Sequence, residues 1–390
     1  MIQSMEKAFR KVEEKVHTSF FYSKNEGKGG LGKDGKIAHD FEAKDFFRFF
    51  SLGERLGQGA TGKVFKATLK GAPEGTETTT YAVKRVRRWG LKESAKQALQ
   101  REVSILHELV HRNVVDIYQF YPRDPQYSYI VLEYMAGGEL FERIIKKDSY
   151  NEMEARDVCV VLISAIGYCH ERGVVHRDIK PSNILLSSKE DDAAIKLADF
   201  GLACSVAEKN IITKCGTPDF MAPEILLGKP HDTSVDMWSV GLVMYILLGG
   251  RHPFYERNTT KMFIRIAAAD FVFDNNWTNT TTEAKDFIFR LLTADPAKRM
   301  TAAEAAGHPW LHAADQSLAN VDLGDNLEQI KIFQAKIKLR AMIKTVLMAQ
   351  RLLSFGKFSD NFVIGKKLGE GAFATVFKAT AVGKGGAASG

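Results

Sequence analysis

The sequence has few cysteines, and their spacing excludes several kinds of site. Only four occur among 390 residues, and no two of them form a Cys-x-x-Cys pair. Zinc and redox sites commonly use that spacing, and small secreted domains use denser cysteine frameworks. The cysteines therefore indicate reduced thiols, and we expect a cytoplasmic protein.

Long apolar runs and targeting signals are absent as well. The most apolar stretches, 158–169 and 237–250, are shorter than the roughly 20 residues that span a bilayer, so they predict buried helices. The N-terminal run MIQSMEKAFRKVEEK is too charged for a signal peptide, and Ile2 excludes N-myristoylation. We expect no transmembrane segment.

The positive charge of the chain is concentrated in one segment. The net charge is +7 with a pI near 9.0, and residues 329–357 carry seven Lys and Arg side chains without an Asp or Glu. A basic balance usually favours nucleic acid or membrane as a partner, but a local surplus has to be judged on its own segment. We therefore expect no nucleic-acid partner.

Hydrophobic periodicity predicts an α+β architecture. Strand-like runs punctuated by glycine fill residues 49–88, and a mainly helical pattern fills 138–310. This order predicts a small β-rich lobe followed by a larger helical lobe, with a cleft between them. Apolar residues at helical spacing in 2–20 predict an amphipathic helix, which a glycine-lysine linker follows at 27–36. We expect four parts, at residues 1–48, 49–312, 313–357 and 358–390.

An internal repeat marks the C-terminal part. LGQGATGKVFKAT at 56–68 returns as LGEGAFATVFKAT at 368–380, with Ala374 in place of the third glycine. The second copy has no following lysine or catalytic motif, so we expect it to be inactive. It indicates either the start of a second, truncated domain or a relic, and we favour truncation.

The first copy is a candidate phosphate loop. Gly57, Gly59 and Gly62 let the backbone turn tightly and approach phosphate oxygens. Dinucleotide folds also use such glycines, but there a helix follows the loop, whereas here a strand-like run follows. Lys84, on the next strand, is a candidate phosphate ligand, and Glu102 on a predicted helix is a candidate partner for a buried ammonium group.

The run VVHRDIKPSNILL carries the strongest chemical pattern. Asp178 suits a general base for a hydroxyl nucleophile, and Lys180 suits neutralisation of a transferred phosphoryl group. Asn183 and the later Asp199, in DFG, are oxygen ligands suited to Mg²⁺. Each residue alone is an ordinary surface or capping side chain, but this order and spacing together indicate phosphoryl transfer.

These motifs resemble those of the eukaryotic Ser/Thr protein kinases over about residues 49–310. The run GTPDFMAPE, with Glu224, the run DMWSVG, with Asp236, and the late Arg299 fit the same family. The resemblance implies a bilobal fold, MgATP as co-substrate and transfer of the γ-phosphate to Ser or Thr. It also implies an ion pair between Glu224 and Arg299.

The resemblance assigns further roles. The backbone of Glu133 to Met135 should meet adenine as the hinge, with Leu132 as gatekeeper, and Arg177 should await a phosphate on Thr213, added by an upstream kinase. The remaining residues implied to line the nucleotide site are Leu56, Val64, Ala82, Glu139 and Leu185.

The basic segment sorts as an amphipathic helix. Apolar residues from Leu339 to Leu353 cluster on one side, and a basic row that includes Lys336 and Arg351 lies beside them. From the residues alone, such a helix fits a membrane surface, a calmodulin target or a helix docked on its own protein.

Its position after the predicted kinase domain, together with GGELFERI and HPF, resembles the calcium/calmodulin-dependent kinase group. That resemblance implies an autoinhibitory helix that Ca²⁺-calmodulin removes, with anchors at Leu339, Ile343 and Met348, spaced one, five and ten. The sequence has no EF-hand loop, so calmodulin is expected in trans.

Two positions depart from the group. Asn326 replaces the threonine that the multifunctional members autophosphorylate, so we do not expect calcium-independent memory by that route. Ser182 stands where basophilic relatives have glutamate, which leaves Glu139 as a candidate partner for an arginine upstream of the phosphoacceptor. A pseudokinase scaffold is the competing hypothesis, against which the intact motif residues argue.

Overall fold

The computed structural model describes residues 44–58, 62–70, 80–91, 93–122, 124, 126–207, 215–354, 362–370 and 375–381. The chain divides into two compact units. The first comprises Met1–Trp89 and Gln119–Val131, and the second comprises Gly90–Tyr118 and Leu132–Gly390. In the described residues, no helix combines the length and apolar character needed to cross a membrane.

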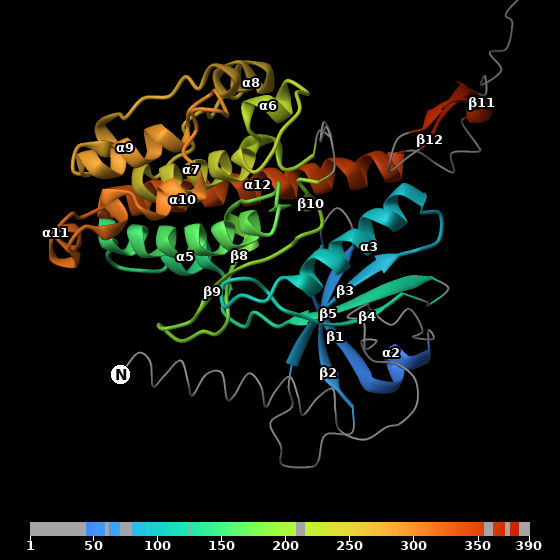
Figure 1. Cartoon of the computed structure of the whole chain (residues 1–390). Helices are drawn as coiled ribbons and strands as arrows, with labels where there is room; N and C mark the ends of the chain where they lie inside the picture. Colours follow the sequence, from blue (N-terminus) through green and yellow to red (C-terminus); the bar gives the residue numbers. More distant parts are fainter. Residues whose placement is uncertain are drawn as a thin grey trace, which may run out of the picture. The chain divides into compact units, whose positions relative to one another are not determined.

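The first unit is built on a five-stranded sheet in the order β1-β2-β3-β5-β4 (Figure 1). The strands are β1 (Phe50–Gln58), β2 (Lys63–Leu69), β3 (Thr80–Arg87), β4 (Ile117–Tyr121) and β5 (Tyr127–Glu133). A short helix, α2 (Lys44–Phe49), precedes them, and its Phe46 ring stacks on Tyr129 with centroids 4.1 Å apart. The β-rich lobe predicted from the sequence is confirmed.

The second unit is mainly helical, as predicted. Its helices are α3 (Glu93–Glu108), α4 (Leu140–Ile144), α5 (Glu152–Glu171), α6 (Pro223–Leu226), α7 (Ser234–Gly249), α8 (Thr259–Ala268), α9 (Thr282–Leu291), α10 (Ala302–Ala306), α11 (Asp315–Ala319) and α12 (Gly324–Ser354), with short 3₁₀ turns η1 (Pro181–Asn183), η2 (Pro218–Phe220), η3 (Asn275–Trp277) and η4 (Pro309–His312). Short strands form a β6-β8-β9 sheet (Gly138–Glu139, Ile184–Leu186, Ile195–Leu197) and a β7-β10 pair (Val174–Val175, Cys204–Ser205).

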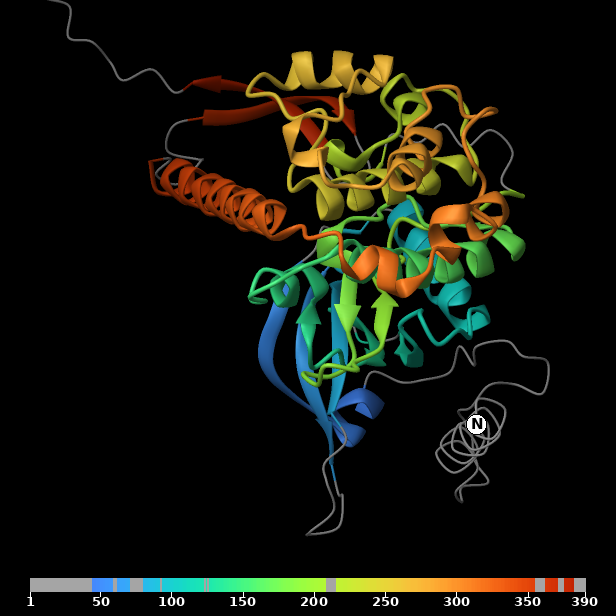
Figure 2. The same cartoon turned by 90° about the vertical axis from the view of Figure 1, so that its left-hand side faces the viewer.

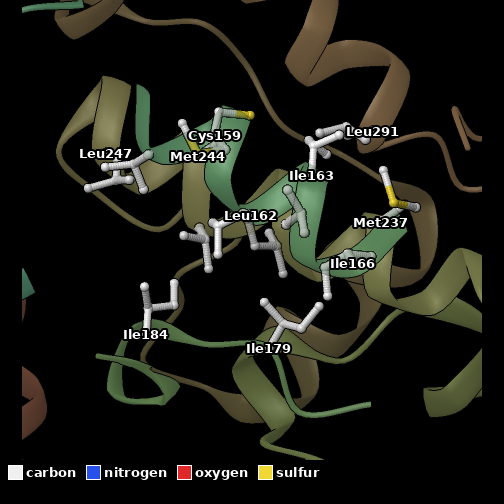
Figure 3. Close-up of a cluster of buried hydrophobic side chains, with 14 of the residues drawn as sticks. Cys159, Leu162, Ile163, Ile166, Ile179, Ile184, Met237, Met244, Leu247 and Leu291 are labelled. Carbon is white, nitrogen blue, oxygen red and sulfur yellow. The ribbon is translucent and has the colours of Figure 1, made fainter. Parts of the chain in front are cut away.

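The core of this unit lies between α5 and α7. Helix α7 is buried almost along its whole length, which explains why its sequence is apolar on every side. Figure 3 shows side chains of α5, such as Leu162 and Ile166, beside Met237 and Met244 of α7. Ile179 enters the same cluster from the loop between β7 and β8, and Ile184 enters it from the start of β8, so the core fixes the chain directly after Asp178.

The segment that leads to α12 is tied to α5. The Glu152 amide donates to Val321 O at 3.1 Å, and the Leu323 amide donates to Tyr150 O at 2.8 Å. The Arg156 guanidinium donates to Ala313 O at 2.9 Å. Residues 313–323 therefore pack as part of the helical unit.

The second glycine copy forms a hairpin of β11 (Phe362–Glu370) and β12 (Thr375–Ala381). It repeats the register of β1 and β2, since Gly57 lies opposite Val64 and Gly369 lies opposite Val376. In the described part of the chain, β11 and β12 pair only with each other. The repeat in sequence is thus a repeat in local structure, without the remaining strands of a lobe.

Candidate active site

The first unit brings the candidate phosphate loop beside Lys84. Val64 on β2 pairs with Gly57 on β1 and with Lys84 on β3, so three neighbouring strands place these residues in one row. Lys84 and Ala82 are buried and, two residues apart on one strand, share a face of the sheet. Leu56 lies on β1 and is partly exposed, whereas Gly59 lies outside the described residues.

Gly62 has a packing reason to be glycine. A Cβ atom there would lie 2.7 Å from the Arg85 carbonyl oxygen and 3.2 Å from Val86 Cγ2. No real Cβ approaches a backbone atom that closely, so a side chain would push the loop away from β3.

In the second unit, the Asp178 carboxylate is the centre of a hydrogen-bond network. Its Oδ1 accepts from Thr217 Oγ1 at 2.8 Å and from the Thr217 amide at 3.1 Å. Its Oδ2 accepts from Lys180 Nζ at 2.6 Å and from Asn183 Nδ2 at 3.2 Å. Lys180 Nζ also donates to Thr217 Oγ1 at 2.9 Å. Two of the predicted residues, Lys180 and Asn183, are therefore assembled around the carboxylate of a third, Asp178.

Thr217 was missed as a site residue by the sequence analysis. The sequence places Thr217 in the run GTPDFMAPE, four residues after Thr213, but gives no partner for its hydroxyl. The fold brings it across 39 residues to Asp178. The neighbouring Gly216 has φ 104°, and a Cβ there would lie 2.7 Å from Arg177 O, so only glycine permits this approach.

A buried carboxylate, Asp236, binds the backbone directly before Asp178. It accepts from the amides of His176 and Arg177, both at 2.8 Å, and from His170 Nε2 at 2.9 Å. Burial alone raises the pKa of Asp236, but hydrogen bonding and charge from His170, and charge from His176, outweigh it and bring that pKa below its usual value. Asp236 therefore stays ionised and fixes the Arg177 backbone in the left-handed region, at φ 65°.

His176 joins this loop to the candidate metal ligand Asp199. Its Nδ1 accepts from the Asp178 amide at 3.2 Å, which places the ring proton on Nε2, and Nε2 donates to Ala198 O at 3.1 Å. Asp199 follows at φ 62° with an exposed side chain. These two hydrogen bonds of His176 connect HRD, at 176–178, to the chain next to DFG, at 199–201, although the two motifs are more than twenty residues apart in sequence.

The oxygen ligands suit a divalent cation. Asn183 Nδ2 donates to Asp178 O at 2.8 Å, so its amide oxygen is oriented as the metal-binding atom. Mg²⁺ is usually held by one or two protein oxygens together with phosphates and water, and Asn183 with Asp199 matches that donor set. In the described residues, no cluster of three or more His, Cys, Asp or Glu side chains forms a metal site.

Comparison with known proteins decides the family. The model of the protein kinase domain matches residues 50–311. The chain belongs to the protein kinase family. A domain of this family uses ATP, together with a divalent metal.

Three related kinases come from one group. The chain is 36% identical over 322 residues to a calcium/calmodulin-dependent protein kinase type 1 of Macrobrachium nipponense, which covers 82% of this chain and 91% of that protein. It is 38% identical over 308 residues to the type IV kinase of Mus musculus, covering 78% of this chain and 63% of that protein. For the type II alpha chain of Drosophila melanogaster the identity is 36% over 326 residues, covering 83% and 59%. This Ser/Thr kinase is thus a member of the calcium/calmodulin-dependent group.

The predicted ion pair of the kinase is present. Arg299 Nη1 and Nη2 donate to the two carboxylate oxygens of Glu224 at 2.7 and 3.0 Å, in a bidentate arrangement. Both side chains are buried, and the Arg299 guanidinium lies over the Trp238 ring at 5.2 Å. This pair links α6 to the loop that precedes α10.

A lysine that the sequence analysis missed contacts the predicted hinge of the kinase. Lys196 on β9 donates from Nζ to Glu133 Oε2 at 2.7 Å and to Asp116 Oδ2 at 3.3 Å. The Glu133 side chain is therefore committed to a partly buried network, and its amide donates to Asp116 O at 2.9 Å, which leaves its carbonyl oxygen as the candidate contact for adenine. Met135 packs in a small apolar cluster that Leu132 and Leu185 join.

The remaining predicted residues of the kinase are distributed over several elements. Glu102, on α3, is buried, but it belongs to the second unit whereas Lys84 belongs to the first. Burial and the charge of Glu142 raise the pKa of Glu139, which Lys338 partly opposes. Arg177 Nε donates to Leu202 O at 2.7 Å. Thr213 lies outside the described residues.

Helix α12 of the kinase is one continuous helix that includes the predicted basic segment (Figure 2). Its Lys338 Nζ donates to Glu142 Oε1, on α4, at 2.6 Å. Leu339 and Ile343 are 57% and 49% exposed. Met348 lies on the same helix, with its side chain outside the described ones.

Proposed function

We propose that this kinase transfers the γ-phosphate of MgATP to Ser or Thr hydroxyls of protein substrates. The hydrogen bonds around Asp178 are the observation that carries the proposal. Thr217, Lys180 and Asn183 hold this carboxylate at fixed positions in a mostly buried site. A carboxylate so oriented accepts the proton of an incoming hydroxyl.

The surrounding residues have distinct roles in this proposal. Lys180 neutralises charge on the transferred phosphoryl group, and its bond to Asp178 sets its position. Asn183 and Asp199 would hold Mg²⁺, which, when bound, neutralises charge on the phosphate oxygens. Lys84 would hold the phosphates together with the glycines at 57, 59 and 62.

The adenine would meet the backbone of Glu133 to Met135. Leu185 and Met135 share an apolar cluster, which supports a role in contacting the base. Leu56, Val64 and Ala82 supply the apolar contribution of the first unit. Glu139 and Glu142 would recognise a basic residue upstream of the phosphoacceptor.

We further propose that α12 inhibits the kinase. The supporting contact is the ion pair between Lys338 and Glu142, because it occupies one of the two carboxylates proposed to recognise substrate. A basic residue of a substrate would have to displace Lys338 to reach Glu142. Inhibition by this contact is therefore competitive with protein substrate.

Calmodulin is the proposed activator. Leu339 and Ile343 expose apolar side chains on α12, and the helix carries no acidic residue from 329 to 354. Such a helix suits the apolar clefts of Ca²⁺-calmodulin, which acidic residues surround. Phosphorylation of Thr213 by an upstream kinase, with Arg177 as the receiving guanidinium, is proposed as a second activating step. The four cysteines form no disulfide, which supports a cytoplasmic location.

The test is phosphate transfer from radiolabelled ATP to a basic Ser peptide. The full chain is assayed with and without Ca²⁺-calmodulin, beside a chain that ends at residue 335 and so keeps the buried base of α12. We expect calmodulin to raise the activity of the full chain and to have no effect on the shortened chain. Failure of the shortened, Thr213-phosphorylated chain to label any acceptor would support a pseudokinase scaffold instead. Activation of the full chain by anionic lipid vesicles, but not by calmodulin, would support a membrane-directed helix.

A further inference from the structure

Helix α12 presents two apolar faces with different surroundings. The first face belongs to the base of the helix, which we define as residues 324–334, and its apolar Leu327 and Ile330 are buried against the helical unit, as is the polar Gln334. The second face points to solvent and lies mainly on the outer segment, which we define as residues 335–354: Leu339, Met342, Ile343 and Val346. The helix therefore changes from a core element to a surface element near Gln334.

Asn326 anchors the base. Its side chain is only 4% exposed, and its Nδ2 donates to Leu248 O at 2.6 Å and to Asn276 O at 2.8 Å. Leu248 lies in the last turn of α7, where carbonyl groups have no partner within their own helix. Asn276 Nδ2 in turn donates to Gly249 O at 3.1 Å, so one polar network covers the end of α7.

Close backbone contact reinforces this anchor. Gly250 ends α7 with φ 79°, and a Cβ there would lie 2.8 Å from Asn326 O and 2.6 Å from Gln329 Cβ. α12 therefore lies against the end of α7 at a distance that only glycine permits (Figure 1). The base cannot separate from α7 without exposing Leu327 and Ile330 and breaking both hydrogen bonds of the buried Asn326 amide.

The outer segment is held far more weakly. In the described residues, Lys338 of the outer segment forms an ion pair with Glu142 of α4. Both side chains are substantially exposed. Exposed ion pairs contribute little to stability because water screens them. Separating the outer end of α12 from the kinase therefore requires the least free energy if the separation begins between Gln334 and Lys338.

We propose that calmodulin captures α12 while the base remains docked, so that activation withdraws residues 335–354 alone and Asn326 is a permanent anchor. This inference rests on the proposed response to calmodulin. The outer apolar face is already exposed in the docked helix, so first contact requires no prior release. Lys336 and Lys338 beside that face favour an acidic partner, and withdrawal of the outer segment then has to break the Lys338 pair and the packing of the half-buried Ile337.

Hydrogen exchange of the full kinase, with and without Ca²⁺-calmodulin, tests this directly. We expect backbone amides in 339–354 to exchange at least tenfold more slowly in the complex, and amides in 324–334 to change by less than twofold. Loss of protection in 324–334 when calmodulin binds would overturn the inference while leaving calmodulin regulation intact. Absence of any change in 339–354 would overturn the proposed calmodulin response itself, and this inference with it.

Asn326→Asp provides an independent test, because it keeps the size of the side chain and removes the donor. We expect calmodulin-independent activity to rise at least fivefold and exchange in 324–334 to accelerate, while affinity for calmodulin stays within twofold. Asn320→Ala, at an exposed position beyond α11, is the matched control and should leave all three unchanged. Unaltered exchange and activity in Asn326→Asp would contradict the anchor. If that variant does not fold, the exchange experiment on the natural sequence still decides.

Discussion

At the scale of single residues, the site depends on carboxylates whose oxygens are fully used. Asp178 receives hydrogen bonds on both oxygens, and Asp236 receives two backbone amides and His170. In the proposed reaction Asp178 accepts a hydroxyl proton, whereas Asp236 holds the backbone of His176 and Arg177 in place. The same residue type thus has a chemical role in one place and a positioning role in the other.

Replacing Asp178 with Asn should separate chemistry from folding. We expect kcat for phosphate transfer to fall by about 10²–10⁴-fold, the usual contribution of a general base, while the far-ultraviolet circular dichroism stays unchanged. The exposed Asp192→Asn is the control and should retain full activity. Comparable activity in the two variants would exclude Asp178 as the base.

The Glu224–Arg299 pair makes a prediction about stability. Both side chains lie in the interior, with exposed fractions of 3% and 0%. Arg299→Met leaves the Glu224 charge buried without its partner, so the free energy of unfolding should fall by about 3–5 kcal/mol. Arg290→Met breaks an exposed pair with Asp286 and should cost about 1 kcal/mol or less. Urea denaturation of both variants measures the difference, and equal losses would refute it.

At the scale of elements, the proposed restraint of the kinase depends on α12 and α4. The two helices are far apart in sequence, and Lys338 joins them through Glu142. The base of α12 contributes to the core, and the outer segment contributes an exposed contact. Single substitutions in the outer segment should therefore weaken inhibition slightly, whereas single substitutions in the base should weaken it strongly.

Lys338→Ala tests the outer segment. An exposed ion pair contributes about 0.2–1 kcal/mol, so calmodulin-independent activity should rise by no more than about fivefold. Kinetics against peptide substrate should place the gain in KM rather than in kcat. Lys331→Ala removes a pair within α12, to Glu328, and should have no effect on KM. A gain in kcat alone would show that Lys338 does not compete with substrate.

At the scale of the whole molecule, buried histidines make stability depend on pH. His252 Nδ1 accepts from the Phe254 amide at 3.2 Å, so its proton lies on Nε2, which donates to Asp219 O at 2.7 Å. Burial lowers the pKa of His252 below 6.5, and burial likewise lowers the pKa of His111 and His231. These rings are neutral in the folded kinase and gain protons more readily when it unfolds.

The sign of the pH effect follows from that difference. Between 6.5 and the lower folded pKa values, the unfolded chain binds more protons, so stability is complete above pH 6.5 and is lost as pH falls below it. The loss should approach about 1.4 kcal/mol per pH unit for the fully buried His252, and it should be smaller for the half-buried His111 and His231. Thermal unfolding between pH 7.5 and 5.5 measures the slope. His252→Asn should flatten it, and the exposed His312→Gln should not; an unchanged slope in the first variant would contradict the assignment.

The sequence by itself determined the parts of this protein that depend on near neighbours. The strands of 49–88, the buried helices and the spacing of Asp178, Lys180 and Asn183 follow from local patterns, because strand and helix periods repeat over few residues. The chemistry of each motif residue follows from its type. Resemblance to kinases then supplied the expected grouping of these motifs.

Only the tertiary structure decided which distant residues meet. Thr217 reaches Asp178, Lys196 reaches Glu133, and Asn326 reaches the end of α7, although nothing in the spacing of these residues marks them as partners. The structure also divided the basic helix into a buried base and an exposed outer segment, where the sequence predicted one uniform amphipathic helix. The physical reason is that burial and pairing depend on what packs against a residue, and that partner is chosen by the fold rather than by the neighbouring sequence.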